Sequence, residues 1–159
     1  MVGDPDIEVL RQQDRERRIK HRARVRAEVE RRGLGSVMNQ TRWTELRAAI
    51  RDLPFAPPYQ RHDVLERPEP LWPSDQQIDP GCWCDECLEP LYAIEWLRII
   101  PRLWRQEGAL VPLKPVGDCS GALRAALSRL NIPYREDDRG IWIHGYATGD
   151  PTLDPGAGG

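Results

Sequence analysis

The run from Leu91 to Ile100 constrains the fold more than any other part of this sequence. It is β-branched, aromatic and nearly continuous in apolarity, as is typical of a central strand covered on both faces. Pro101 ends the run, since proline cannot donate to the hydrogen-bond ladder inside a sheet. The rest of the chain is therefore expected to assemble a sheet around residues 91–100.

Two amphipathic helices are predicted, one before this strand and one after it. The first follows a capping residue at Asn39 or Thr41 and stops at Pro54. Its apolar side chains recur at helical spacing: Trp43, Leu46, Ala49, Ile50 and Leu53. The second follows Asp118 or Ser120, and its apolar stripe consists of Leu123, Ala126, Leu127 and Leu130. Each helix can cover one face of the sheet.

Further strands complete the sheet. A strand is predicted over residues 60–65 and a short one over residues 110–113, and a turn at 137–140 joins a hairpin of 132–136 and 141–146. A long, proline-rich loop occupies residues 66–81. This order predicts an α+β fold, with a small antiparallel sheet and two helices packed on one face.

A separate charged helix is expected over residues 6–32. It contains no internal Pro or Gly, and its few apolar residues make no sustained stripe. The predicted organisation is a charged helical arm and linker at 1–37, the α+β domain at 38–146 and a disordered tail at 147–159.

Charge is unevenly distributed. Residues 1–37 carry ten Lys/Arg and seven Asp/Glu, a balance of +3, whereas residues 38–159 have a balance of −5. Five arginines of the arm fall on one helical face: Arg11, Arg15, Arg18, Arg22 and Arg26. This stripe is consistent with binding to nucleic acid phosphates or to an acidic protein, or with a solvated helix in which acidic residues are interleaved.

A cluster of cysteines at Cys82, Cys84 and Cys87 is the main chemical motif. Three thiolates are one short of a closed tetrahedral zinc site, and the fourth ligand would be Cys119, His62 or His144. The alternatives are thiols without a metal, or a redox CxxC motif. The redox motif lacks its usual position at the start of a helix beside a βαβ unit.

Aromatic side chains suggest a protein-binding surface. Trp72, Trp83 and Trp104, with Glu95 in the central strand, are the candidate contact residues, because Trp dominates binding hot spots. The same rings could instead complete the core. The expected partner of the Glu95 carboxylate within the chain is Arg98 or Arg102.

No catalytic residues are assigned. A Cys119 pair with His144 or His62 is conceivable, but there is no nucleophile-elbow or phosphate-binding glycine motif. No apolar run could span a membrane and no signal sequence is evident, so a cytoplasmic protein without a disulfide framework is expected.

Four segments together resemble a family of small bacterial proteins of unknown function: Met38–Trp43, Leu53–Gln60, Ile94–Arg102, and Ile132 to Tyr146. The resemblance covers residues 38–146. It implies a compact α+β domain with no established activity. The cysteine cluster departs from the family pattern, so a metal site would be particular to this chain or its near relatives.

The function expected from the sequence is protein binding without catalysis or a cofactor, by analogy with small immunity or antitoxin proteins. The alternative is a zinc-stabilised module whose basic N-terminal helix binds nucleic acid. Affinity that falls steeply with salt would distinguish the second.

Overall fold

The computed structural model describes residues 4–73, 80–112 and 114–149. The helices are α1 (Pro5–Arg31), α2 (Gln40–Ile50), α3 (Asp85–Leu88) and α4 (Ser120–Arg129), with a 3₁₀ turn at Leu91–Ala93. The strands are β1 (Gly35–Ser36), β2 (Tyr59–Asp63), β3 (Ile94–Ile99), β4 (Arg102–Arg105), β5 (Lys114–Asp118), β6 (Arg135–Asp137), β7 (Gly140–His144) and β8 (Tyr146–Ala147).

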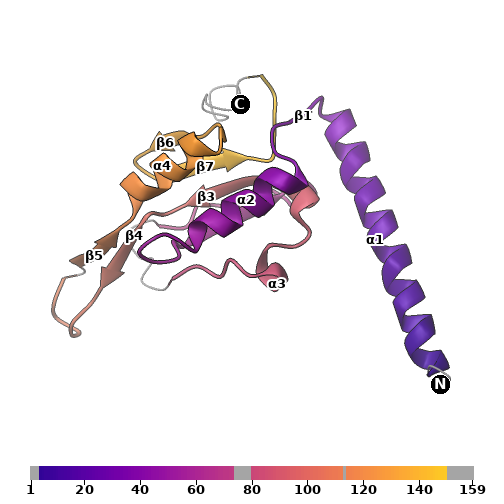
Figure 1. Cartoon of the computed structure of the whole chain (residues 1–159), viewed down its shortest axis with the longest axis horizontal. Helices are drawn as coiled ribbons and strands as arrows, with labels where there is room; N and C mark the ends of the chain where they lie inside the picture. Colours follow the sequence, from indigo (N-terminus) through magenta and orange to yellow (C-terminus); the bar gives the residue numbers. More distant parts are fainter. Residues whose placement is uncertain (1–3, 74–79, 113, 150–159) are drawn as a thin grey trace.

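The main sheet has four antiparallel strands in the order β2-β3-β7-β6. The apolar run at residues 91–100 supplies β3, with β2 and β7 as its neighbours. Helices α2 and α4 lie over the same face of this sheet (Figure 1). The predicted α+β fold, with a small antiparallel sheet and two helices on one face, is confirmed.

The hydrophobic core lies between this face and the two helices. Alternate residues of β3 and β7 point into it, because successive side chains of a strand point to opposite faces. Leu97 and Ile99 from β3 meet Ile141 and Ile143 from β7, and all four are fully buried. From the helices the core receives Trp43, Leu46, Ile50, Leu123 and Leu127.

The other face of the sheet is polar and aromatic. It carries the residues that alternate with the core set: Gln60, His62, Trp96, Arg98, Trp142 and His144. The loop after β2 lies against this face. The side-chain amide of Gln60 donates to the Pro70 carbonyl and its oxygen accepts from the Trp72 backbone N–H, while Arg98 donates to the Trp72 carbonyl.

Helix α1 is attached to the body by its C-terminal half only. Val25 is 2% exposed and packs with Val64 and Ala93, and the His21 ring is hydrogen-bonded to the Tyr92 hydroxyl at 2.8 Å. The N-terminal half of α1 stands away from the body (Figure 1). The domain boundary at residue 37 stays a prediction, although contacts with the body reach back to His21.

Pairing of β1 with β8 joins the segment between α1 and α2 to the last strand of the described chain. Gly35 and Ser36 are in register with Ala147 and Tyr146. Ala147, which the sequence assigned to the disordered tail, is thus part of a strand. The rest of that tail from residue 150 lies outside the described residues.

The predicted short strand at 110–113 is wrong. Residues 110–112 belong to the connection between β4 and β5, which form a two-stranded sheet of their own, and residue 113 lies outside the described part. β5 contains Pro115 and Gly117, two residues that sequence patterns exclude from strands but that an edge strand tolerates. Within the described residues, no helix is both long and apolar enough to cross a membrane.

Candidate functional site

A row of side chains in ring–ring and cation–π contact crosses the polar face of the sheet. The rings of His62 on β2 and Trp96 on β3 stack with centroids 5.1 Å apart. Trp96 and Trp142 on β7 are also 5.1 Å apart, and the guanidinium of Arg135 on β6 lies 4.6 Å from the Trp142 ring centroid. Asp137 accepts hydrogen bonds from Trp142 and Arg135 at that end. The row therefore links all four strands.

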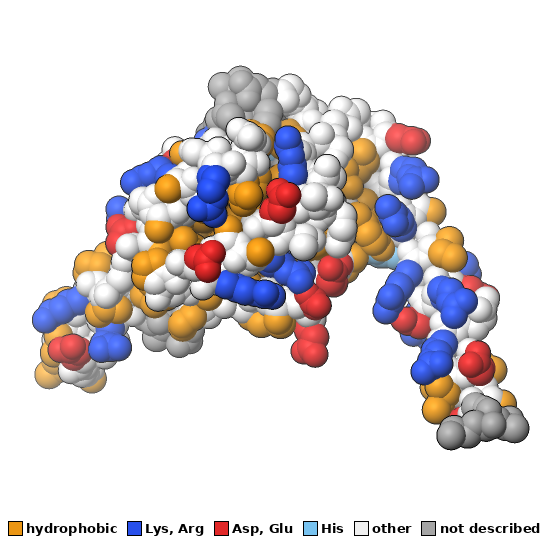
Figure 2. Space-filling view, in the orientation of Figure 1, with side chains coloured by type: hydrophobic (Ala, Val, Ile, Leu, Met, Phe, Trp, Pro, Cys, Tyr) orange, Lys and Arg blue, Asp and Glu red, His pale blue; other side chains and the backbone are white. Residues whose placement is uncertain are grey.

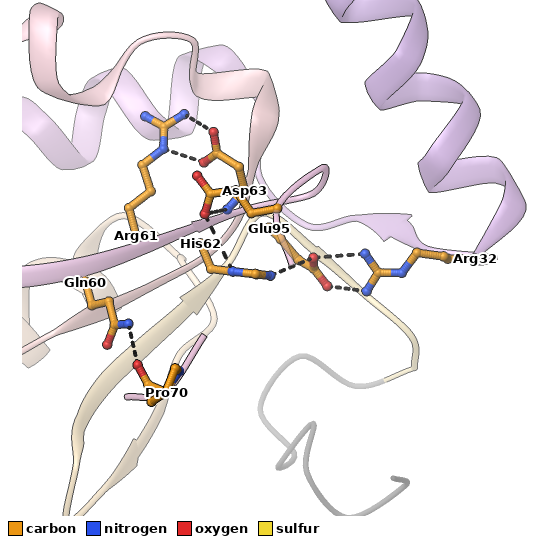
Figure 3. A network of polar contacts seen from close by, with 8 residues as sticks. Arg32, Gln60, Arg61, His62, Asp63, Pro70 and Glu95 are labelled. Atoms are coloured by element: carbon orange, nitrogen blue, oxygen red, sulfur yellow. Dashed lines mark hydrogen bonds and ion pairs between the residues drawn. The ribbon is translucent and has the colours of Figure 1, made fainter. Parts of the chain in front are cut away.

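At its other end the row meets a charged network (Figure 3). The Nε2 atom of His62 lies 3.7 Å from a Glu95 carboxylate oxygen, and its Nδ1 atom lies 3.7 Å from Glu66. Arg32, at the end of α1, donates to both carboxylate oxygens of Glu95. A bidentate guanidinium–carboxylate contact of this kind is geometrically specific. It fixes the end of α1 beside the sheet.

This network borders an open hollow of about 460 Å³. The polar side chains around it are Glu28, Arg31, Arg32, His62, Glu66 and Glu95. Most of these charges are already satisfied, since Arg31 pairs with Glu28 and Arg32 with Glu95. The arrangement can position a polar group by hydrogen bonds, and its described lining contains no Ser, Thr, Cys, Lys or Tyr side chain.

Glu95 has a different partner from the one that the sequence suggested. Arg98 donates instead to Gln60, Trp72 and Arg139, and Arg102 pairs with Asp118. The expectation of an Arg98 or Arg102 partner is therefore wrong. The positive charge that pairs with the Glu95 carboxylate belongs to Arg32, 63 positions earlier in the chain, because α1 ends beside β3.

The three clustered cysteines converge in the structure. Their ligand atoms all lie within 4.8 Å of one another, and all three residues are exposed. Cys84 Sγ is 3.0 Å from Cys82 Sγ and 3.4 Å from Cys87 Sγ. Cys82 and Cys87 are paired as a disulfide, a local bridge between residues five positions apart. Cys84 remains free beside that pair.

Cys119 does not join this group. It lies at the start of α4, is 1% exposed, and donates its backbone N–H to the Pro101 carbonyl. Burial, with a contribution from the Asp118 charge, raises the pKa of the Cys119 thiol to about 11. Neither His62 nor His144 belongs to the group found among the described residues. The sequence suggested Cys119, His62 or His144 as a fourth zinc ligand, and none of them lies with the cysteine cluster.

The four residues predicted to contact a partner have separate surroundings. Trp72 is 48% exposed on the loop against the polar face. Trp83 donates to the Pro57 carbonyl and packs edge-on against Tyr59, so its ring is part of the structure beside the cysteines. Trp104 is on β4 and borders a small hollow next to α4. Glu95 lines the separate hollow beside α1.

All five arginines of the predicted stripe are exposed on α1. Figure 2 shows Lys and Arg side chains along this helix, with Asp and Glu side chains among them. Two arginines of the stripe already have partners in the chain. Arg18 pairs with Asp14 at 3.0 Å, and the guanidinium of Arg22 lies 5.2 Å from the centroid of the Tyr92 ring.

The sequence analysis did not predict this row of side chains or the Arg32 contact. A signal for the row was present: Ile141-Trp142-Ile143-His144 alternates apolar with large polar or aromatic residues, and Leu97 in β3 is likewise flanked by Trp96 and Arg98. Such alternation on two paired strands places one set on a second, polar face. The Arg32 contact has no comparable local signal.

A pH-dependent stability is expected from His144. Burial, aided by the nearby Arg135 charge and opposed by Glu95, lowers the pKa of His144. The unfolded chain then takes up a proton that the folded chain does not, so stability should fall as the pH drops below about 6.5 and level off below the folded pKa. Urea unfolding at about pH 7.5 and about pH 5 should show a smaller acid loss for His144→Gln than for the natural chain. An equal loss in both would contradict this assignment.

These features define a small α+β protein with one polar sheet face, a surface cysteine cluster and a helix that extends from the body. A model of a family of unknown function, DUF6678, matches residues 25–150, and the chain belongs to that family. The resemblance to a family of unknown function is thus confirmed, and the match begins at the buried Val25 within α1. No curated protein and no solved structure gives a match.

Proposed function

We propose that this protein is a non-enzymatic protein-binding domain whose partner docks on the N-terminal half of α1. One observation carries the proposal. Residues 5–20 are all exposed, and they include the large apolar side chains of Ile7, Val9, Leu10 and Ile19. In the structure this half of the helix extends beyond the body (Figure 2).

The N-terminal half of α1 projects from the body, so packing against the rest of the chain stabilises it little. Helical stability in proteins comes mostly from tertiary packing, and a short helix without packing is marginal in water. Ile7 and Leu10 lie one turn apart at the tip and are 47% and 62% exposed. Covering such side chains is worth roughly 25 cal/mol per Å² of apolar surface, a gain that only a partner can supply here.

Protein is favoured over nucleic acid as the partner. The exposed half of α1 interleaves its cations with Asp6, Glu8, Asp14 and Glu16. Nucleic acid binding depends on uncompensated positive charge, whereas protein interfaces combine apolar and mixed polar side chains. We also propose that the protein is of the immunity or antitoxin type and that it is located in the cytoplasm.

The proposal predicts that a photo-crosslinking residue at position 10 captures one protein that the same residue at position 110 does not. Leu110 is 98% exposed at the tip of the β4–β5 connection, so it is a matched apolar control. The captured protein is then purified and titrated. Replacing Ile7 and Leu10 together by glutamine, a good helix former, should weaken its binding about 100-fold, as expected for the loss of two buried anchors.

Leu110→Gln should leave that affinity unchanged. The proposal fails if position 10 enriches no protein above the control, or if the double variant binds the purified partner as tightly as the natural chain. None of the three positions contributes to the core, so each variant should keep the fold. Circular dichroism and unfolding curves of each variant check this.

A further inference from the structure

We infer that Cys82, Cys84 and Cys87, when reduced, form a three-thiolate site for zinc that leaves one coordination position open. This inference is independent of the proposed partner binding. A tetrahedral zinc ion with Zn–S bonds of about 2.3 Å keeps its sulfurs roughly 3.8 Å apart. Cys84 Sγ lies 3.0 and 3.4 Å from the other two sulfurs. Small side-chain rotations would therefore bring the three sulfurs to the spacing of zinc ligands.

The backbone before the cysteines is held firmly in place. Gly81 donates its N–H to the Ala56 carbonyl, and a side chain at Gly81 would overlap the Pro57 carbonyl. The Trp83 indole donates to that same carbonyl at 2.8 Å. Tyr59 donates its hydroxyl to the Cys82 carbonyl. These contacts involve the chain on both sides of Cys82, and they position that thiol independently of any disulfide.

The backbone after the cysteines is held by a second set of contacts. Leu88 is 2% exposed and is part of the main core, one residue after Cys87. Arg61 on β2 donates to the carbonyl of Leu88, and Arg47 on α2 pairs with Asp85. A metal site whose ligands are positioned before binding loses less conformational freedom when the ion arrives.

The number of ligands follows from what lies around the cluster. Within the described residues, no other His, Cys, Asp or Glu shares the cluster that these three cysteines form. Cys119 is buried elsewhere as a thiol of raised pKa. Zinc sites with three protein ligands keep a fourth position for water or an added ligand, whereas structural sites are closed by four. The exposed position of the cluster leaves that fourth position accessible to solvent.

Binding and disulfide formation exclude one another. A zinc ion needs three thiolates, so the three thiols release three protons on binding and the site acquires a net charge of −1. The Cys82–Cys87 disulfide leaves a single thiol and would not hold the ion. Zinc should therefore bind only after reduction, and bound zinc should protect the cysteines from oxidation and alkylation.

The experiment uses the full chain, reduced with a phosphine and titrated anaerobically with Zn²⁺ or with Co²⁺ as a spectroscopic probe. We expect one ion per chain, thiolate-to-cobalt charge-transfer absorption, and visible bands of tetrahedral cobalt. Adding imidazole should shift those visible bands, because an open fourth position accepts it. Cys82→Ser, Cys84→Ser and Cys87→Ser should each weaken zinc binding at least about tenfold.

Cys119→Ala is the control, and it should leave the stoichiometry, the affinity and the spectrum unchanged. The inference is overturned if the reduced chain binds no stoichiometric ion, or if Cys119→Ala weakens binding as much as the cluster variants. Cobalt bands that do not respond to imidazole would overturn the open position. Alkylation counts of the four thiols, measured by mass spectrometry with and without zinc, provide a readout that does not depend on colour. Three thiols should be protected.

Discussion

Replacing Gly145 by alanine is expected to destabilise the protein by about 3 kcal/mol, through overpacking at a site that cannot relax. A Cβ at this position would overlap the Ile94 carbonyl oxygen, and it would lie 3.4 Å from Cζ2 of the buried Trp43. Backbone atoms cannot rotate away as a flexible side chain can. The added methyl group must therefore push β3 and the segment after β7 apart.

Three segments meet at Gly145, which is why the effect should be large. Its N–H donates to the Glu95 carbonyl, and its own carbonyl accepts from the N–H groups of Val37 and Met38. Displacing Gly145 therefore disturbs its bond to Glu95 in β3 and its bonds to the segment just before α2 at the same time. A loss of this size should lower the melting temperature by roughly 10 °C for a chain of this length.

Gly121→Ala is the matched control for thermal unfolding. Gly121 lies in the first turn of α4, where a methyl group added to its Cα would have nothing within 4 Å, and alanine is the better helix former. The melting temperature of this variant should stay equal or rise slightly. If Gly145→Ala melts within about 2 °C of the natural chain, the tight contact between these segments is not a feature of the folded protein.

Local patterns predicted the elements of the fold well. The apolar run became β3, the helical spacing after Asn39 became α2, and Asn39 caps it by accepting from the Arg42 backbone N–H at 2.8 Å. These features depend on nearest neighbours in sequence and on periodic burial, both of which a single sequence carries. The apolar spacing after Asp118 became α4 in the same way, but the N-cap residue is Cys119 rather than the predicted Asp118 or Ser120, and Asp118 accepts from the Ser120 N–H just before the helix.

Long-range placement could not be predicted in the same way. The Arg32–Glu95 contact depends on α1 ending beside β3, which in turn accompanies the pairing of β1 with β8. Gly35 and Ser36 have no strand pattern, and a two-residue strand is defined only by its partner. The position of Cys119 apart from the other cysteines is likewise a consequence of topology, since α4 begins away from residues 82–87.

Arg98→Met should cost about 2–3 kcal/mol, because it removes the donor for three acceptors while keeping a similar volume. Arg98 is 1% exposed, and its guanidinium donates to Gln60 Oε1 at 3.0 Å and to the carbonyls of Trp72 and Arg139 at 2.6 and 2.9 Å. Burial lowers the pKa of Arg98, so its charge is held at a cost that these bonds offset.

Two opposing effects decide the sign of this change in stability. Removing a buried charge is favourable, and replacing a whole buried polar network by apolar groups can be neutral. Here the acceptors remain. The Trp72 and Arg139 carbonyls can regain water when the loop loosens, but Gln60 is only 2% exposed, and its side-chain oxygen loses one of its two donors in a place that water does not reach. The unfavourable effect should therefore be the larger, and the loop at residues 66–73 should become easier to cleave by protease.

A double-mutant cycle separates this explanation from simple loss of packing. Gln60→Leu combined with Arg98→Met removes both members of the buried pair, so the double variant should be more stable than the sum of the single losses predicts, by about 1 kcal/mol. Arg124→Met breaks an exposed pair with Glu136 and should cost no more than about 0.5 kcal/mol in the same urea titrations. Strictly additive losses would show that Arg98 and Gln60 act independently. In that case each side chain would attach the loop to the polar face through its own contacts, Gln60 through Pro70 and Trp72 and Arg98 through the Trp72 carbonyl.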